Sequence, residues 1–557
     1  MNLSGISKKI GVKKNNPGLT TIFFSLISII FLTPILLILI SLLEGYSSTW
    51  NHLLETVLSE YVTNSLLLVL GVSFGVFILG VSTAWLITSC NFKGKTFFKW
   101  SLVLPLSIPP YIMAYAFTGL FDSSGSMNNI VQSIFNLESS SIFFPSIRNI
   151  TGCIIIFSFT LYPYVYLIAQ TAFINQSRDI FDTGRTLGLS KKETFLKLGL
   201  PLARPAIIAG LMVVAMETIS DFGAVEHFAI PTFTTGIFRT WFGMNDLTTA
   251  KQLAALLFVF FLFFLVIEKY SRKKIKFIQT LTSNRQLVPV RLTGLKAIIA
   301  TIFCSIPILI GFLIPVLQLS FWAISYNMEY FDNQFISSAL NTIVLAVLTG
   351  FFCVAISISF NYLIRIKNNN FLAYSNKIIS SGYGIPGVIL AIGVLDLFSI
   401  INIYTNILLI GSIGGLILVY TIKFYALPNS SIESGFRKIN KNIDEAAQTL
   451  GARKNEVLRK IHIPMLKNSA IIALLLIGIE VIKELPATLI LRPFNFDTLS
   501  VSAYIYASDE RMIEAAAPSI GIVLISLIPI LLLIRILDKE EDEYAKTRQC
   551  NIFLFEK

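Results

Sequence analysis

Charged side chains are scarce in this chain of 557 residues, because Asp, Glu, Lys and Arg together make up only 14% of it. A water-soluble domain usually carries about 25% charged residues. Hydrophobic residues make up 54% of the chain, and the mean hydropathy is +0.73. The shortage of charge therefore excludes an ordinary water-soluble enzyme and indicates a membrane protein.

Cysteine and nucleotide-binding motifs are also lacking. The five cysteines are scattered without any Cys-x-x-Cys pair, which argues against a disulfide framework or a zinc site. Gly94-Lys95-Thr96 resembles the end of a P-loop, but Ser89 stands where that motif requires its first glycine. The three histidines are too widely separated to suggest a metal triad. We therefore expect this chain to hold no metal centre and no cofactor, and to hydrolyse no nucleotide itself.

Long apolar runs are abundant instead, and they predict an all-α polytopic membrane protein. One membrane-spanning helix needs about 20 apolar residues. A transmembrane barrel would show short alternating segments rather than such runs. We expect about twelve spans, at residues 20–43, 64–88, 101–120, 151–174, 205–225, 251–268, 295–318, 340–363, 378–398, 405–426, 468–490 and 518–537.

The distribution of basic residues predicts the orientation of these spans. The formal net charge is +12, and Lys and Arg gather in alternate loops rather than on one soluble module. Cytoplasmic loops carry the excess of Lys and Arg, so both termini are predicted to lie in the cytoplasm. The first apolar run, 20–43, is longer than the core of a signal peptide and is expected to stay as the first span.

The chain is also internally repeated. Asn64 and Pro109 recur as Asn341 and Pro386 at an offset of 277 residues, and a later glycine and proline recur at an offset of 263. Two copies of an even-numbered helical unit are related by an axis along the membrane normal, which predicts a pathway between them. We expect a cytoplasmic segment at 1–19, a first six-helix repeat at 20–268, a cytoplasmic linker at 269–294, a second six-helix repeat at 295–537 and a cytoplasmic tail at 538–557.

Two predicted cytoplasmic loops carry the most specific motif. The second reads Glu445-Ala446-Ala447, three residues, Gly451, nine residues and then Ile-His-Ile-Pro464. This pattern resembles the EAA loop of ABC-importer permeases. The first loop repeats it more loosely, with Thr and Gly in place of the two alanines, at Asp182, Thr183, Gly184, Gly188 and Pro201. A glycine turn between two short helices would form a compact projection. The resemblance implies that each loop binds one ATPase subunit.

The segments after the two loops narrow the resemblance. They read Ser220-Asp-Phe-Gly-Ala-Val-Glu-His227 and Lys483-Glu-Leu-Pro-Ala-Thr488, and they are similar to those of the fused two-repeat permeases of ferric-iron ABC importers. The resemblance covers almost the whole chain and implies a type I-like permease fold in the bacterial inner membrane. Thiamine and phosphonate permeases are close alternatives for the substrate.

The same resemblance implies how such a transporter is assembled. ATP and Mg would bind to two partner ATPase subunits on the cytoplasmic side, and this chain would not be an enzyme. An extracytoplasmic iron-binding protein would deliver the substrate at outer segments near residues 227–250 and 491–515. Nucleic acid is not expected as a partner.

Four acidic residues inside predicted spans are the candidates for the translocation pathway. Glu217 and Asp221 lie four residues apart in one repeat, and Glu480 and Glu484 recur at an offset of 263 in the other. Oxygen ligands suit a hard metal cation, and buried carboxylates are costly unless they face a cavity or a partner. Alternatively, these acids pair internally, as Glu480 would with Lys483, or cap helix breaks.

Two rival classes of protein share part of this pattern. An ion-coupled secondary transporter would have the twelve spans and the buried acids, but it would not need two EAA-like loops. A membrane scaffold without transport activity would not need carboxylates at equivalent positions of two repeats. We therefore favour the permease subunit of a binding-protein-dependent ABC importer.

Overall fold

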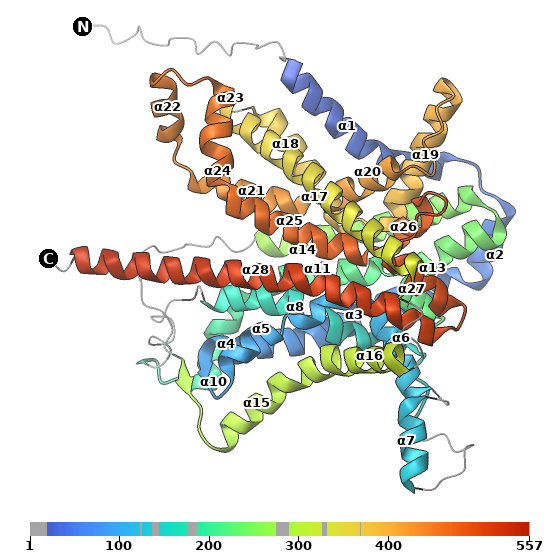
Figure 1. Ribbon diagram of the computed structural model, residues 1–557, viewed down its shortest axis with the longest axis horizontal. Helices are drawn as coiled ribbons and strands as arrows, with labels where there is room; N and C mark the ends of the chain where they lie inside the picture. The colour runs from blue at the N-terminus through green and yellow to red at the C-terminus, as the bar shows by residue number, and fades with distance from the viewer. Residues whose placement is uncertain are drawn as a thin grey trace.

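The computed structural model describes residues 19–122, 125–135, 144–174, 176, 182, 184, 186–273, 289–325, 331–367 and 369–555 (Figure 1). Over these residues the secondary structure is almost entirely helical. The one sheet found there has two short parallel strands, β1 (Cys90–Asn91) and β2 (Val290–Arg291). The prediction of an all-α membrane protein is confirmed.

The helices of the two repeats follow one another in the same order. Those of the first repeat are α1 (Leu19–Ile40), α2 (Ser48–Thr56), α3 (Leu58–Val76), α4 (Ser82–Ser89), α5 (Lys95–Ser101), α6 (Pro110–Phe121), α7 (Ser126–Phe135), α8 (Ile150–Ile174), α10 (Lys191–Thr194), α11 (Leu200–Ser220), α12 (Gly223–His227), α13 (Phe233–Phe238) and α14 (Leu247–Lys273). Those of the second are α15 (Leu295–Ile308), α16 (Ile314–Ser325), α17 (Asn333–Lys367), α18 (Asn370–Ile379), α19 (Gly387–Thr405), α20 (Ile413–Phe424), α21 (Ala426–Lys438), α22 (Lys441–Thr449), α23 (Lys454–Val457), α24 (Ile463–Met465), α25 (Lys467–Lys483), α26 (Pro486–Leu491), α27 (Leu499–Ser508) and α28 (Met512–Phe555).

Nine helical segments of the described chain are long and apolar enough to cross a membrane. Two further candidates are bent pairs of helices, one bent by 91° between Ser107 and Pro110 and the other by 68° between Met465 and Lys467. The remaining predicted span, 405–426, corresponds to α20, which is apolar but only 12 residues long. The expected number of about twelve therefore holds only when broken and short helices are counted.

At least five predicted spans are wrong in their bounds. The expected helix 378–398 is broken between α18 and α19, and the expected helix 468–490 is broken between α25 and α26. Three others differ for a local reason. The expected helix 101–120 is interrupted because Pro109 and Pro110 lack backbone N–H donors, and a new helix starts at Pro110. The expected helix 205–225 ends at Ser220, where the following residue is extended. The expected helix 405–426 begins only at Ile413, since Asn406 takes a left-handed conformation that ends α19.

The two repeats exchange their first spans. Helix α1 of the first repeat packs against α18 and α19 of the second, whereas α15 and α16 of the second pack against α4, α5 and α6 of the first (Figure 1). Two glycines permit the close approach. A Cβ at Gly393 of α19 would lie 2.4 Å from the carbonyl oxygen of Pro34, and one at Gly119 of α6 would collide with the Trp322 ring. The repeats are thus intertwined rather than merely adjacent.

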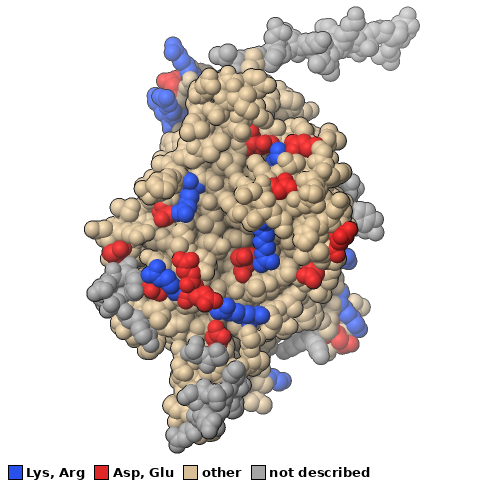
Figure 2. Space-filling view, turned by 90° about the vertical axis from the view of Figure 1, so that its right-hand side faces the viewer, with Lys and Arg blue, Asp and Glu red and all other residues tan. Residues whose placement is uncertain are grey.

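The two ends of the helical bundle differ in what they carry. Helices α22, α23 and α10 lie at the left-hand end of Figure 1, where α1 begins and α28 ends. Helices α2, α13 and α26 lie at the right-hand end. The face at that end carries Lys, Arg, Asp and Glu side chains close together (Figure 2). A continuous apolar core from both repeats separates the two ends.

Candidate functional site

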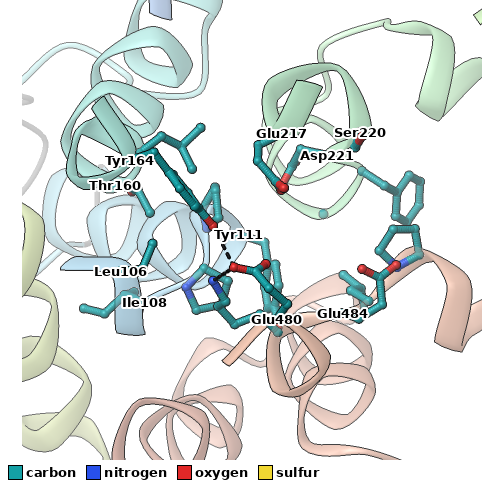
Figure 3. A pocket seen from close by; sticks show the side chains of 18 of the residues that line it. Leu106, Ile108, Tyr111, Thr160, Tyr164, Glu217, Ser220, Asp221, Glu480 and Glu484 are labelled. Atoms are coloured by element: carbon teal, nitrogen blue, oxygen red, sulfur yellow. Dashed lines mark hydrogen bonds and ion pairs between the residues drawn. The ribbon is translucent and has the colours of Figure 1, made fainter. Parts of the chain in front are cut away.

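The four predicted carboxylates lie around one cavity between the two repeats (Figure 3). Glu217 and Asp221 stand at the end of α11, and Glu480 and Glu484 stand at the end of α25. The volume of the cavity is about 70 Å³, which is room for a few water molecules or a partly hydrated ion. Its other lining side chains include Leu106, Ile108, Tyr111, Thr160, Tyr164, Lys423, Lys483 and Pro486.

Both carboxylate pairs lie at a helix break of the same construction. After α11, the Asp221 carboxylate accepts a hydrogen bond of 2.9 Å from the Ala224 N–H and so caps α12. After α25, Glu484 accepts from the Ala487 N–H at 3.4 Å, at the start of α26. A side-chain oxygen at this position satisfies a backbone donor that has no partner inside the helix. The two breaks therefore place the N-terminal ends of the short helices α12 and α26 beside the cavity.

Hydroxyl and amide groups repeat this equivalence beyond the breaks. Thr234 Oγ1 donates to the backbone carbonyl of Asp221 at 2.7 Å, and Ser500 Oγ donates to that of Glu484 at 2.8 Å. Two asparagine amides are also equivalent. The Asn64 amide of α3 donates to the Pro231 carbonyl at 3.0 Å, and the Asn341 amide of α17 donates to the Asp497 carbonyl at 3.0 Å. The duplication read from the sequence is therefore also present in the hydrogen bonds.

The second-repeat carboxylates are both paired with lysines. Lys423 of α20 forms an ion pair with Glu484, and the side chains are 8% and 6% exposed. Lys483 Nζ lies 3.5 Å from Glu480 Oε1, which also accepts a hydrogen bond of 2.8 Å from the Tyr164 hydroxyl. A buried charge is tolerated when a partner of opposite sign and further hydrogen bonds compensate its desolvation.

The first-repeat carboxylates have no such partner. At the same offset of 263, Thr160 stands where the second repeat has Lys423, and Ser220 stands where it has Lys483. Among the described residues, no Lys or Arg lies within ion-pair distance of Glu217 or Asp221. The alternative interpretation of these acids, internal pairing or helix capping, therefore applies to three of the four. Asp221 caps a helix, Glu480 is paired and Glu484 does both, whereas Glu217 does neither within the described chain.

The Tyr111 side chain adds a further polar group to the cavity. It comes from the first turn of α6, is 3% exposed, and its hydroxyl has no hydrogen-bond partner. Buried hydroxyls without a partner are rare in native proteins. Among the described residues, no three His, Cys, Asp or Glu side chains approach closely enough to hold a metal ion. The cavity is therefore polar and lined by four carboxyl groups, but these are not assembled as a metal centre in this conformation.

Sequence reasoning missed several lining residues. Lys423 stands inside an apolar run, and a lysine in a membrane span is by itself a signal of function or pairing. Tyr111 follows the Pro109-Pro110 pair that breaks a span. Nothing in the sequence pointed to Tyr164, because a tyrosine in an apolar run is common and its contact with Glu480 joins residues 316 positions apart.

The second coupling loop, defined here as residues 441–464, has the geometry that its motif predicts. Helix α22 ends at Thr449, and Gly451 follows with a φ of 84°, a left-handed conformation that glycine adopts without strain. Glu445 and Ala446 are exposed on α22, whereas Ala447 is buried. Pro464 stands in the first turn of α24, where its missing N–H costs no hydrogen bond.

The first coupling loop, residues 182–201, is described in part. Thr183 lies outside the described residues, whereas Asp182 and Gly184 are helical. Gly188 has a φ of 75°, and Pro201 stands in the first turn of α11. Like Gly451 and Pro464, these residues mark a left-handed turn and the start of the next helix.

The helix after each glycine turn starts with a similar cap. The Glu193 carboxylate accepts a hydrogen bond from the Ser190 N–H at 3.0 Å, and Glu456 accepts from the Arg453 N–H at 2.9 Å. Hydrogen bonds from Ser190, followed by the interaction with Lys197, lower the pKa of Glu193 to about 2. In the first loop the cap is reciprocal, because the Glu193 N–H also donates to Ser190 Oγ at 3.3 Å, and such capping fixes the first turn of a helix. The Arg453 side chain has no acceptor, so the second cap consists of the bond to Glu456 alone.

Each loop exposes a leucine directly before its turn glycine. Leu187 is 70% exposed and Leu450 is 88% exposed. The sequence shows that these two leucines occupy equivalent positions of the two repeats. It does not show that their side chains are exposed. A leucine held in solvent at the same position of two loops indicates a contact surface rather than core packing.

The second loop is also held by an ion-pair cluster at its base. Arg365 of α17 lies 2.6 Å from Asp444 and donates hydrogen bonds of 3.0 Å to the carbonyls of Phe436 and Ile439. Asp444 also lies 2.8 Å from His462 Nε2. The first repeat has no equivalent, because Thr88 stands at the position of Arg365 and Gly199 at that of His462.

Comparisons with known proteins agree with this architecture. Residues 76–273 match the family model described as binding-protein-dependent transport system inner membrane component. The chain is 25% identical over 531 residues to the Fe(3+)-transport system permease protein FbpB 2 of Haemophilus influenzae, covering 93% of this chain and 98% of that protein.

Shorter relatives match one part of the chain. The molybdenum transport system permease protein ModB of Escherichia coli K12 is 26% identical over 31% of this chain and 71% of its own length. The sulfate transport system permease protein CysT of Salmonella typhimurium is 25% identical over 36% of this chain and 72% of its own length. Taken with the duplicated helices and loops, these matches support a fused two-repeat, multi-pass inner-membrane permease of a binding-protein-dependent ABC transport system, the transport subunit rather than a catalytic one.

Proposed function

We propose that this permease carries ferric iron inward across the bacterial inner membrane. The observation that supports this cargo most directly is the cavity between the repeats, which four carboxylates and two lysines line. If all six groups are ionised, the cavity carries two net negative charges. Carboxylate and phenol oxygens suit a hard cation such as ferric iron.

The sign of this charge separates the candidate cargoes. Sulfate and phosphonate are anions, and carboxylates without an excess of cationic groups would repel them. Thiamine is cationic, but a cavity of about 70 Å³ would have to widen considerably to admit an organic molecule of its size. The name of the relative that matches nearly the full chain also refers to Fe(3+) transport.

The proposed partners are two ATPase subunits and a substrate-binding protein. One ATPase would bind each coupling loop, with ATP and Mg held on the ATPase and the termini of this chain on the same cytoplasmic side. The exposed leucines and the glycine turns support this assignment. The binding protein would dock at the opposite end of the bundle, where α13 and α26 both lie (Figure 1) and where Arg239 pairs with Glu226 at 3.5 Å.

The domain limits follow the same assignment. The repeats would comprise residues 20–268 and 295–537, joined by the cytoplasmic linker 269–294 and flanked by the terminal segments 1–19 and 538–557. The exchange of first spans between the repeats implies that neither repeat would form a complete pathway alone. We therefore expect the two halves, when expressed separately, to regain transport only on co-assembly.

The test is ATP-dependent uptake of radiolabelled ferric iron into proteoliposomes that contain this chain with its ATPase and binding protein. Thiamine and sulfate serve as parallel substrates. Uptake of iron alone is the expected result. Uptake of thiamine or sulfate alone would replace the cargo and keep the transporter class, whereas iron uptake that ignores ATP and stops with an uncoupler would support a secondary transporter.

A further inference from the structure

We propose that Lys423 and Lys483 act as tethered counter-cations that hold the second-repeat carboxylates while the cavity is empty, so that an entering cation first meets Glu217 and Asp221. This inference rests on the proposed function in that the cargo is a hard cation. It adds that the two repeats have different roles in binding the ion. The first repeat receives the ion, and the lysines of the second limit how tightly it is held.

The asymmetry of the cavity is the first observation behind this proposal. Glu484 is paired with Lys423 and Glu480 with Lys483, while Thr160 and Ser220 occupy the equivalent positions of the first repeat. Both lysines line the same cavity as Glu217, which has no ion-pair partner of its own within the described residues. Both lysines therefore line the cavity, but their ion pairs are with the carboxylates of the second repeat alone.

A purely structural role does not explain this asymmetry. If the lysines were needed to hold the helix breaks together, both breaks would need them. The break after α11 has the same cap and the same hydroxyl-to-carbonyl hydrogen bond as the break after α25, and it forms without any lysine. The lysines are thus dispensable for the local fold, and another function has to account for them.

The unpaired Tyr111 hydroxyl is the second observation. Tyr111 lines the cavity, its side chain is 3% exposed, and its hydroxyl has no partner. It lines the same cavity as both carboxylate pairs. A phenol oxygen in that position is a ready ligand for a hard cation as it passes from one pair to the other.

The lysines also answer a physical requirement of transport. Four free carboxylates around a trivalent ion would hold it far too strongly to release it, because the attraction between charges is large where water is scarce. A cation that passes through a site must bind weakly enough to leave. Two tethered positive charges weaken the site without closing it, and each can move back to its carboxylate when the ion departs.

Terbium luminescence tests the proposal without requiring transport. Tb³⁺ is a hard trivalent ion, and nearby tyrosines such as Tyr111 and Tyr164 sensitise its emission. The full-length chain in nanodiscs would be titrated with Tb³⁺ as wild type and as the variants Lys423→Thr and Lys483→Ser, which install the residues of the first repeat. The matched control is Lys251→Met, since Lys251 is equally buried and is paired outside the cavity, with Glu44 at 3.2 Å and with Asp396 at 3.5 Å.

We expect each cavity variant to bind Tb³⁺ at least about tenfold more tightly, because one positive charge has been removed from a poorly solvated site. Lys251→Met should bind as wild type does, and Glu217→Gln should bind at least about tenfold more weakly. Unchanged or weaker binding by both lysine variants would overturn the proposal. If Lys423→Thr does not fold, Lys483→Ser alone decides. If the lysine variants bind Tb³⁺ more tightly but the assembled transporter takes up no iron, ferric iron is the wrong cargo and the role of the lysines as counter-cations stands.

Discussion

The exposed leucine of the second coupling loop gives a prediction whose size follows from the structure. The Leu450 side chain is 88% exposed, so its truncation removes little packing among the described residues. If an ATPase subunit covers it, the complex gains the free energy of burying a leucine, about 1.5–3 kcal/mol. The substitution Leu450→Ser should therefore weaken ATPase binding by about 10- to 150-fold.

The assay is the dissociation constant of the ATPase subunit on nanodiscs that carry the wild-type or variant permease. Leu187→Ser is the equivalent change in the first loop and should have an effect of similar size. Leu54→Ser is the matched control, since Leu54 is 61% exposed on α2 at the opposite end of the bundle. Thermal unfolding should be the same for all three variants because no buried contact is removed.

Three results would refute this reasoning. If Leu450→Ser binds the ATPase as tightly as wild type does, the loop tip is not the contact surface. If Leu450→Ser and Leu54→Ser weaken binding equally, the effect is not specific to the loops. Loss of binding together with a lower unfolding temperature would show that Leu450 supports the fold, which contradicts its exposure.

Three further predictions concern the pathway and the loops. Glu217→Gln combined with Glu480→Gln should lower iron uptake at least about tenfold while the ATPase still co-purifies, because the carboxylates lie far from the loops; unchanged uptake would remove them from the pathway. Gly451→Ala should destabilise the loop by about 1–2 kcal/mol, since the φ of Gly451 is 84° and therefore left-handed. It should also reduce ATPase co-purification, whereas the control Gly478→Ala inside α25 should not. Arg365→Met should destabilise the second loop by about 1.5–3 kcal/mol, because Asp444 and two backbone carbonyls lose the guanidinium that binds them. The loss should be seen as faster amide exchange in α22 but not in the first loop.

Much of this architecture could be predicted from the sequence because it depends on local patterns. Apolar runs determine the spans, and the glycine and proline of each coupling loop determine a turn and a helix start. The carboxylates could be predicted to meet because repeats related by an axis bring equivalent positions together. Long-range contacts could not be predicted, such as the hydrogen bond from Tyr164 to Glu480 or the pairing of Lys423 with Glu484.

The breaks in the helices explain the errors in the predicted spans. Hydropathy averages over a window, so it reads residues 468–490 as one span although Glu484 ends one helix and Pro486 starts the next. The same holds for Asp221 after α11. The interruptions stand where the cavity is, because a backbone that leaves the helix inside a membrane must find other hydrogen-bond partners there.

The helices α11 and α25 connect the coupling loops to the carboxylates, and this connection suggests how the loops act on the cavity. Helix α11 starts beside Pro201 and ends at Ser220, so movement of the first loop would be carried over about 30 Å to Asp221. The second connection is different, since the chain bends by 68° between Met465 and α25. A straight connection transmits displacement, whereas a bent one also transmits rotation. Closure of the two ATPases should therefore shift the first-repeat carboxylates along the pathway and turn those of the second repeat about it, which would separate the pairs and let a bound cation leave.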